Sequence, residues 1–412
     1  MTPPSSDPFG KYNGREAEYA LECLDSENPR NKQQPWVRRL EAAFCQRLGS
    51  PYAIAHNSGT STLHSCLEAV EVGFGDEVLM PAQTVSMLAF VTVAQNAIPV
   101  FVDSDPGTFN LSPDDLARKI TPRTKAIIAV HMHGLMADMD PIMEAARRHG
   151  VPVIEDCAQS PLATYKGRLA GTIGEMASFS FETKKHLSTG EGGMVTTGDA
   201  DLATKIRKFG GLGYKTLTSG TGLRALLPED FQNPHFKRHD THALNYRLPE
   251  ICAAVGLAQL ERADALVARR REVARLFLEA LEGCEWIVPQ QTPSHSENAY
   301  WTFTVRYEGE LARGISWRGF YDQVKAAGGD GFYGGLGLIY QEPFLREKTF
   351  LRHRLPADHP AFAGRFDYPD GLCPEAEKLQ PKLMQFKTNY RDLDQARRQA
   401  EILRQTIRRI GI

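Results

Sequence analysis

Short apolar runs alternate with stretches of helical spacing over most of the first half of the chain. This alternation predicts right-handed β/α crossovers and a mostly parallel sheet whose two faces are covered by helices. Ligands of such sheets bind beyond the carboxyl ends of the strands, so a site is expected there. The expected strands lie at 52–56, 77–80, 99–103, 125–131 and 151–155. The expected helices between them include Leu63–Val70, Ser86–Gln95 and Asp140–Arg148.

The 412 residues are enough for more than one domain. We expect an α/β protein with an N-terminal segment at 1–35, a large domain at 36–265 and a smaller α+β C-terminal domain at 266–412. Apolar spacing predicts a helix at 36–48 and one long helix from about 250 to 282. Four further features are an alternating strand at 300–307, a basic helix at the end of 374–412, a long loop at 214–244 and a solvated helix face at 269–271.

Composition and charge exclude several classes of protein. With a formal net charge of −2, the chain shows no sign of binding nucleic acid or an anionic membrane. The seven cysteines are scattered, which favours free thiols in a reducing compartment over disulfides or a zinc site. The first residues are polar and rich in proline, and no apolar run approaches the roughly 18 residues of a membrane helix. We therefore expect a cytoplasmic protein with no membrane or nucleic-acid partner.

A small polar turn follows the first expected strand. The residues Asn57-Ser-Gly-Thr-Ser-Thr62 stand between strand 52–56 and helix 63–70. Free amides and the helix dipole meet at such a turn, which makes it a candidate anion site. The alternative is ordinary helix capping by Ser or Thr.

Two acidic residues end the strand in Val151-Pro-Val-Ile-Glu-Asp-Cys-Ala-Gln-Ser160. A carboxylate at Asp156 could keep a pyridine nitrogen protonated, as a pyridine-based electron sink requires. The small residues after it leave room for a flat ring, and Gln159 could donate to a ring oxygen. The alternative is an aspartate that caps a helix.

The segment 178–193 brings a hydroxyl, Ser180, and a lysine, Lys185, into a turn rich in glycine. A lysine at the end of a buried strand has a lowered pKa, which frees its amine as a nucleophile for a Schiff base. The alternative is a surface lysine pair before a glycine turn. An anion cradle, a buried carboxylate and a buried lysine together are what pyridoxal phosphate requires.

These residues resemble the DegT-like sugar aminotransferases, which are pyridoxal-phosphate enzymes of the aspartate-aminotransferase fold. The resemblance is strong over about 40–282 and looser beyond. It rests on seven motifs: Ser58-Gly-Thr-Ser-Thr, Gly75-Asp-Glu-Val, Pro99-Val-Phe-Val-Asp103, His133-Gly followed by Asp138-Met-Asp, Ile154-Glu-Asp-Cys-Ala-Gln-Ser160, Ser178-Phe-Ser with Lys185 and Gly190-Glu-Gly-Gly, and Asn245-Tyr-Arg.

The resemblance implies a role for each matching residue. Lys185 would be the Schiff-base lysine and Asp156 the partner of the ring nitrogen, while Gln159 would donate to the phenolic oxygen. Asn245 would reach the phosphate of the neighbouring subunit, which implies a homodimer with shared active sites. The remaining phosphate ligands would be Gly59, Thr60, Ser61 and Ser180.

One position departs from the family pattern. After Pro81-Ala-Gln-Thr84 the family usually has an aromatic residue that stacks on the cofactor, and this chain has Val85. An apolar contact remains, while the stacking, worth about 0.5–1.5 kcal/mol, has to come from elsewhere or is lost.

The resemblance implies transfer of an amino group from glutamate or glutamine to a keto group of a sugar nucleotide, sugar or cyclitol. Family dehydratases carry His where this chain has Lys185, so transamination is favoured over dehydration. A catalytically silent regulator of the same fold is the other alternative, and no DNA-binding appendage supports it. The segments 214–244 and 333–340 are expected to shape the acceptor pocket.

Overall fold

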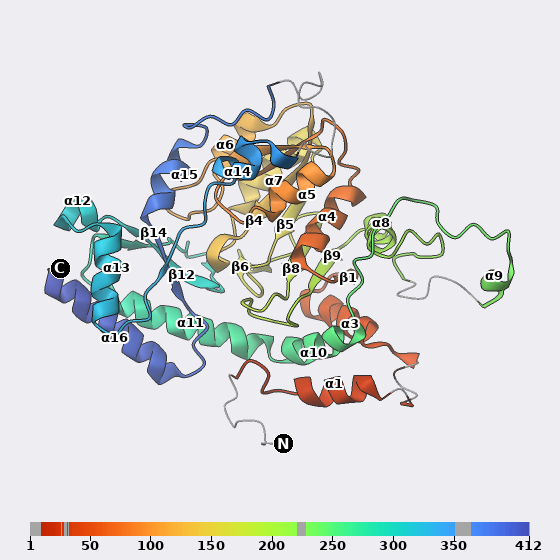
Figure 1. Cartoon of the computed structure of the whole chain (residues 1–412), viewed down its shortest axis with the longest axis horizontal. Helices are drawn as coiled ribbons and strands as arrows, with labels where there is room; N and C mark the ends of the chain where they lie inside the picture. The colour runs from red at the N-terminus through yellow and green to blue at the C-terminus, as the bar shows by residue number, and fades with distance from the viewer. Residues whose placement is uncertain are drawn as a thin grey trace.

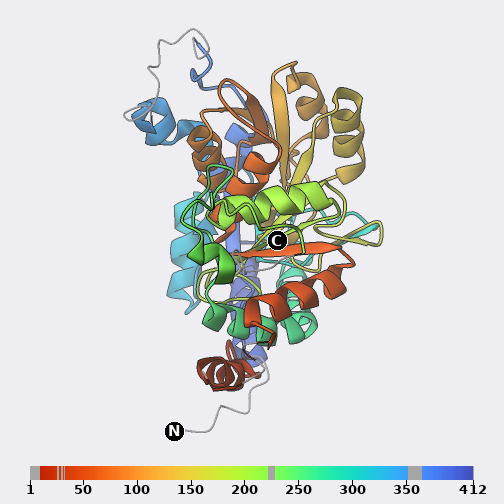
Figure 2. The same cartoon turned by 90° about the vertical axis from the view of Figure 1, so that its right-hand side faces the viewer.

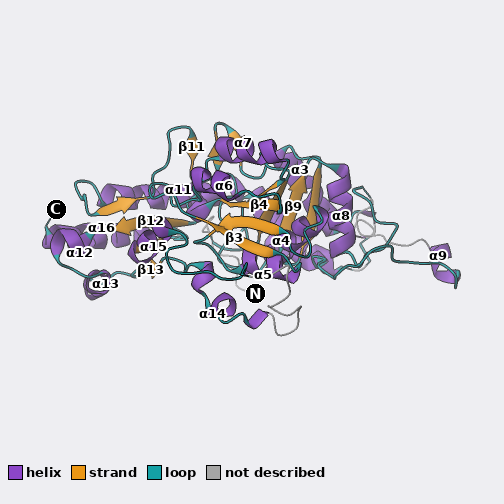
Figure 3. Cartoon of the chain, turned by 90° about the horizontal axis from the view of Figure 1, so that it is seen from above, coloured by secondary structure: helices purple, strands orange, loops and turns teal. Residues whose placement is uncertain are grey.

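The computed structural model describes residues 10–411 except 26, 29–30, 32, 221–227 and 351–363. A seven-stranded sheet forms its centre, and helices cover both faces (Figure 1, Figure 3). The strand order is β1 (Tyr52–His56), β9 (Gly193–Thr197), β8 (Met176–Ser180), β5 (Val153–Asp156), β4 (Thr124–Val130), β2 (Glu77–Pro81) and β3 (Ile98–Val102). The predicted α/β architecture and all five expected strands are confirmed, with boundaries that shift by up to two residues.

The sheet is parallel except at β9, which pairs antiparallel with both β1 and β8. The other neighbouring pairs, β8 with β5, β5 with β4, β4 with β2 and β2 with β3, are parallel. β9 follows β8 through the turn that carries Lys185, so this turn reverses the chain direction within the sheet. The sequence prediction did not include β9.

Alternating side chains send each strand's apolar residues to two separate cores. On β4, Ile127 and Ala129 enter one core, and Ala126, Ile128 and Val130 enter the other. The first core is closed by α3 (Trp36–Leu48), α6 (Pro113–Lys119), α7 (Met139–His149) and α10 (Glu250–Glu261). The second core is closed by α4 (Gly59–Ala69), α5 (Met87–Ala94) and α8 (Ala200–Gly210).

A second, antiparallel sheet stands beside the first. Its strands are β10 (Ile287–Pro289), β12 (Thr302–Tyr307), β14 (Leu383–Lys387) and β13 (Tyr333–Gly334). A third apolar core joins it to α11 (Ala263–Ala280), α13 (Trp317–Ala326) and α16 (Leu393–Ile410). The predicted strand at 300–307 and the terminal basic helix are therefore present. Figure 1 shows this part at the C-terminal end of the molecule, opposite α9 (Pro228–Gln232).

The boundary between the two larger units remains a prediction. Residues 338–345 and 373–376 belong to the C-terminal half of the chain, yet they pack in the second core of the large sheet, beside β2 and β3. A division at 265 therefore does not follow the apolar cores throughout.

At the other end of the chain, α1 (Glu16–Leu24) lies against α10, below the large sheet in Figure 2.

Two predictions about 250–282 are wrong. The expected single helix is broken at Arg262, which ends α10 and starts α11. The arginine cluster 269–271 is not a uniformly solvated face, because Arg270 is only 6% exposed. Its guanidinium is held by backbone oxygens of segments far away in the sequence, and local periodicity does not report such contacts.

The segment 214–244 contains α9 and a bridge between Tyr214 and His239, within its described residues. Figures 1 and 3 show α9 projecting at one end of the molecule. Among the described residues, no helix has the length and apolar character needed to cross a membrane. The remaining short elements are β6 (Thr164–Tyr165), β7 (Arg168–Leu169), β11 (Ser296–Glu297), α12 (Gly309–Arg313), α14 (Pro343–Arg346) and α15 (Pro374–Leu379).

Candidate active site

A cleft of about 1010 Å³ opens at the carboxyl ends of β1, β5 and β8. Parallel strands place their carboxyl ends at one edge of the sheet, which brings distant motifs together. Six residues predicted for the site line this cleft: Gly59, Thr60, Val85, Asp156, Ser180 and Lys185. The other lining residues are Ser58, Leu63, Met87, Ala158, Glu182, Lys184, Glu191 and Trp301. The segment 333–340 and the described residues of 214–244 contribute none of them.

The first wall of the cleft is the N-terminus of α4. The Ser58 hydroxyl accepts from the Ser61 amide at 3.0 Å, and the Ser61 hydroxyl accepts from the Ser58 amide at 3.1 Å. Thr62 makes the first intrahelical bond, to the Ser58 carbonyl. The amides of Gly59 and Thr60 precede that bond and are therefore placed to bind an anion. The Ser61 side chain, in contrast, is buried and serves the capping box.

Gly59 lies against the carboxyl end of β8. A Cβ at this position would lie 2.8 Å from the Ser180 Cβ. Real Cβ atoms do not come so near, so this turn requires glycine for its packing. The close approach puts the Ser180 hydroxyl beside the α4 amides, and the Ser180 oxygen accepts from the Glu182 amide at 3.4 Å. The N-terminus of α4 and the carboxyl end of β8 therefore meet at the place where the sequence predicts an anion site.

The two acidic residues that end β5 point to opposite faces of the sheet, as neighbours on a strand must. Glu155 is fully buried and accepts from His131 Nε2 and from the amides of Ile173 and Gly174. Burial alone would raise the pKa of Glu155, but these hydrogen bonds bring it below its usual range. Glu155 therefore holds a turn together on the side away from the cleft.

Asp156 faces the cleft. Its Oδ1 accepts from the Ala158 amide at 3.0 Å, and the side chain is 2% exposed. Burial raises the pKa of Asp156, because a buried carboxylate is poorly solvated. A protonated ring nitrogen placed opposite Asp156 would compensate this charge, so the site fits the cofactor at this point.

Gln159 lies buried just behind the cleft wall. Its Oε1 accepts from the backbone amide of His133 at 2.7 Å. This bond fixes the orientation of the side-chain amide, because the oxygen faces His133 and the NH₂ group must point to the other side, where it can donate a hydrogen bond. His133 adopts a left-handed backbone conformation with φ of 62°, which turns its amide toward Gln159. The arrangement is compatible with the predicted donation to a ring oxygen.

Lys185 is half-buried in the turn between β8 and β9. Burial lowers the pKa of its amine, and the nearby Asp156 carboxylate opposes part of this shift. The Lys185 Nζ lies 4.5 Å from the ring centroid of Trp301. A lysine in this environment is the better nucleophile of the pair, because its neighbour Lys184 is exposed.

Trp301 was not among the predicted site residues. It precedes β12 of the second sheet, and its indole Nε1 donates to the Lys184 carbonyl at 3.2 Å. The sequence signal available was a tryptophan beside an alternating strand, which does not reveal that the strand reaches the lysine turn. Val85 is half-buried in the same cleft. The cleft thus contains an aromatic side chain, Trp301, although position 85 is a valine.

Asn245 lies outside the cleft of its own chain. It is exposed, bridges to Gly211, and its Oδ1 accepts from Arg247 Nε at 3.0 Å. The structure therefore brings six predicted residues to the cleft, places Gln159 and Ser61 directly behind its wall, and leaves Asn245 on another surface.

The profile of the DegT/DnrJ/EryC1/StrS aminotransferase family matches residues 11–327. A GDP-perosamine synthase of Caulobacter vibrioides is 39% identical over 314 residues, which are 74% of this chain and 77% of that protein. A GDP-perosamine synthase of Escherichia coli O157:H7 is 39% identical over 266 residues, 64% of this chain and 68% of that protein.

Solved structures share the fold across nearly the whole chain. An aminotransferase from Psychrobacter cryohalolentis superposes with a TM-score of 0.82 at 27% identity, covering 96% of this chain and 97% of that one. A 3-amino-5-hydroxybenzoic acid synthase gives a TM-score of 0.78 at 26% identity, covering 99% and 100%. The predicted aspartate-aminotransferase-like fold is confirmed.

Proposed function

The chain belongs to the DegT/DnrJ/EryC1/StrS aminotransferase family, and from that premise we propose that it aminates a keto group on a nucleotide-linked sugar, with glutamate or glutamine as donor. It is a pyridoxal-phosphate-dependent aminotransferase. When bound, the cofactor supplies an electron sink for the carbanion formed at the reacting carbon. The protein residues bind the cofactor, orient it and move the proton.

Five groups of the protein would contact the cofactor. The amides of Gly59 and Thr60 and the Ser180 hydroxyl would hold its phosphate, with Ser61 fixing the turn through the capping box. Asp156 would keep the ring nitrogen protonated. The Gln159 amide, oriented by His133, would donate to the phenolic oxygen.

Lys185 carries the proposal, because its amine faces the same cleft as the buried Asp156. We assign it two roles. With the cofactor bound, it would hold the aldehyde carbon, and as a free amine it would move a proton between the substrate carbon and the cofactor. A proton acceptor must be neutral, and burial lowers the pKa of the Lys185 amine, which favours the neutral form relative to an exposed lysine.

The acceptor is the less constrained half of the reaction. Both GDP-perosamine synthases at 39% identity favour a nucleotide-linked keto sugar over a free sugar or a keto-cyclitol. We further propose a cytoplasmic homodimer, in which Asn245 of the partner subunit reaches the cofactor phosphate. The exposed position of Asn245 away from its own cleft is consistent with that role. The division into 1–35, 36–265 and 266–412 also stands as a proposal.

The proposal is tested with purified enzyme and pyridoxal phosphate. We expect a visible absorbance band of the lysine-bound cofactor, which glutamate or glutamine bleaches and a keto acceptor restores. Lys185→Ala should lose the band and reduce turnover by roughly 10³-fold or more, whereas Lys184→Ala keeps the band.

Acceptor chemistry is read from the mass of the product. A GDP-linked keto sugar, a free keto sugar and a keto-cyclitol are offered in parallel. A product that gains an amine from the nucleotide sugar supports the proposal. A product that has lost water instead would establish dehydration, and full activity of Lys185→Ala would refute the lysine assignment.

A further inference from the structure

Arg270 is a buried arginine with no catalytic role in the proposed reaction. It lies on α11, behind the turn that carries Lys185, and is 6% exposed. Burial lowers its pKa to about 10, so the side chain stays charged at neutral pH. Burying a charged group is costly unless its hydrogen bonds are satisfied, and the structure satisfies them in one particular way.

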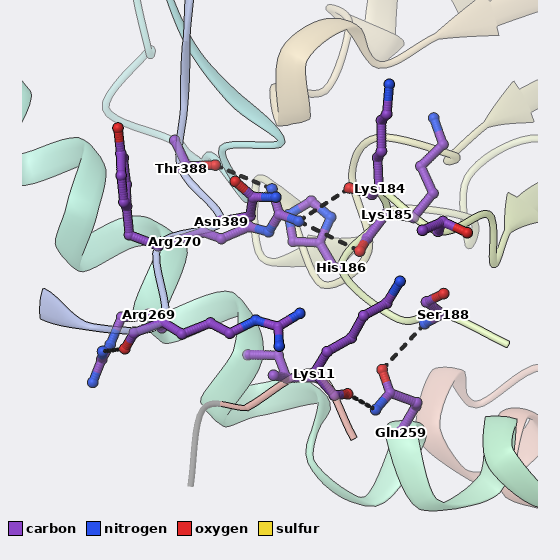
Figure 4. A pocket seen from close by; sticks show the side chains of 14 residues that line it. Lys11, Lys184, Lys185, His186, Ser188, Gln259, Arg269, Arg270, Thr388 and Asn389 are labelled. Atoms are coloured by element: carbon purple, nitrogen blue, oxygen red, sulfur yellow. Dashed lines mark hydrogen bonds between the residues drawn. The ribbon is translucent and has the colours of Figure 1, made fainter. Parts of the chain in front are cut away.

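The guanidinium of Arg270 bonds to three separate segments. Its Nη2 donates to the carbonyls of Lys184 at 3.2 Å and Lys185 at 3.4 Å. Its Nη1 donates to the Trp301 carbonyl at 2.8 Å and to the Thr388 hydroxyl at 3.1 Å. Figure 4 shows the bonds to Lys184, Lys185 and Thr388 converging on this side chain. One rigid group therefore ties the lysine turn to the second sheet.

Thr388 and Trp301 complete the network. The Thr388 hydroxyl donates to the carbonyl of Tyr300 at 2.6 Å and lies 2.9 Å from that of Trp301. The Trp301 indole returns to the Lys184 carbonyl, and its ring lies beside the Lys185 amine. Moving the guanidinium would thus move both the lysine backbone and the ring next to its amine.

The charge of Arg270 is not paired with a carboxylate in its surroundings. Fourteen described residues line the pocket around it, and they include lysines and arginines but no Asp or Glu (Figure 4). The four acceptors of Arg270 are neutral oxygens. Its positive charge therefore acts on nearby groups, and it lowers the pKa of Lys185 as a smaller contribution beside burial.

We propose that Arg270 is a positioning residue, which fixes the backbone of the 184–185 turn so that Lys185 rather than Lys184 faces Asp156. This inference rests on the proposed role of Lys185. Both lysines line the cleft, so the backbone orientation of the turn decides which of them faces Asp156. Four hydrogen bonds from a planar, charged donor make a rotation of the turn costly.

Borohydride trapping tests this positioning directly. The enzyme is loaded with pyridoxal phosphate, reduced with borohydride, digested, and the labelled lysine is identified by mass spectrometry. Wild type should carry the label on Lys185. Arg270→Met should divert at least a tenth of the label to Lys184 and lower kcat about 10- to 100-fold, with the donor KM within about threefold.

Two further variants separate positioning from folding. Arg275→Met alters an exposed arginine of the same helix, paired with Glu279, and should behave as wild type. Arg270→Lys keeps the positive charge but loses the planar guanidinium donor. The pH dependence of its absorbance band should therefore match that of wild type, whereas its kcat should recover only in part relative to Arg270→Met. If Arg270→Met does not fold, as judged by circular dichroism, the labelling pattern of Arg270→Lys decides.

The lysine that carries the label decides the outcome. Label confined to Lys185 in both Arg270 variants overturns the inference, whether or not kcat falls, because Arg270 would then act only through packing. Label on both Lys184 and Lys185 in an Arg270 variant supports the inference. A wild type that carries no label on Lys185 refutes the proposed function itself, and this outcome is distinguishable because it does not depend on Arg270.

Discussion

At the scale of single residues, β5 ends in a structural acid, Glu155, and in Asp156, the acid that we propose binds the cofactor. Glu155 and Asp156 are adjacent and both buried, yet they face opposite sides of the sheet. We expect Asp156→Asn to keep the fold, to weaken cofactor binding and to lower kcat by about 10²-fold, because an amide cannot hold the ring nitrogen protonated. Titration of the absorbance band and steady-state kinetics measure both effects.

The matched control is Glu155→Gln. Its new NH₂ group would face backbone amides that now donate to Glu155, so we expect a loss of about 2–4 kcal/mol in the free energy of unfolding. The folded fraction should keep near-normal kcat. The opposite pattern, in which Glu155→Gln abolishes cofactor binding and Asp156→Asn does not, would reverse the assignment.

Buried histidines make stability depend on pH. His56 is 1% exposed, its Nε2 pairs with Ser65 Oγ at 2.8 Å, and burial lowers its pKa to about 4. The unfolded chain, with a histidine pKa near 6.5, binds more protons between these values. Stability is therefore present above about pH 6.5 and is lost as the pH falls toward 4.

We expect His56→Gln to remove this contribution. The free energy of unfolding of wild type should fall between pH 7.5 and pH 5.5 by about 1.4 kcal/mol more than that of the variant. Urea denaturation at the two pH values measures the difference. Equal pH dependence in the two proteins would show that His56 does not titrate on unfolding in this range.

At the scale of elements, the order of strand, polar turn and helix at the α4 N-terminus agrees with the sequence prediction. The helix begins at Gly59 rather than at the expected Leu63, because the capping box of Ser58 and Ser61 starts it inside the predicted turn. The sequence could not show that β8 packs against Gly59. That contact joins residues more than a hundred positions apart, so no local pattern carries it.

We expect Gly59→Ala to disturb this packing. The added methyl would lie 2.8 Å from the Ser180 Cβ, so α4 or β8 must shift and the anion cradle must widen. Cofactor affinity should fall about tenfold, since one phosphate contact is worth on the order of 1.4 kcal/mol. Gly73→Ala is a suitable control, because a Cβ there meets no atom within 4 Å. Unchanged affinity in Gly59→Ala would contradict the assignment.

β9 and the helix break show why other elements escaped prediction. β9 follows a glycine turn and contains residues suited to several structures, and it becomes a strand by pairing with β1 and β8 on either side. The interruption at Arg262 has no proline or glycine to announce it. Arg262 bonds Glu16 at 2.8 Å and thereby anchors the N-terminal α1, a contact between residues 246 positions apart in the sequence.

At the scale of the whole molecule, the proposed homodimer predicts complementation. Lys185→Ala and Asn245→Ala alter two residues that would meet in one site only across the subunit interface. A mixed dimer of the two variants then contains one site with both native residues and one site with neither. After unfolding and refolding of an equal mixture, we expect about a quarter of wild-type activity, provided that subunits pair at random.

The control is each variant refolded alone, which should stay near its own low activity. Activity in the mixture equal to the mean of the two variants would mean that Asn245 does not act across the interface. Size-exclusion chromatography with light scattering shows whether dimers form at all, which keeps the two conclusions apart.

The sequence by itself determined the alternation of most strands and helices, the parallel character of most of the sheet, the family and the three motifs that we propose bind pyridoxal phosphate. These properties are written in residues close together along the chain, as apolar periodicity and as short motifs. Only the tertiary structure decided that Trp301 lies beside Lys185, that Arg270 is buried under the lysine turn, and that Glu155 and Asp156 divide their roles. Such contacts depend on the path of the chain between distant segments, and a buried charge is recognisable only when its partners are in place.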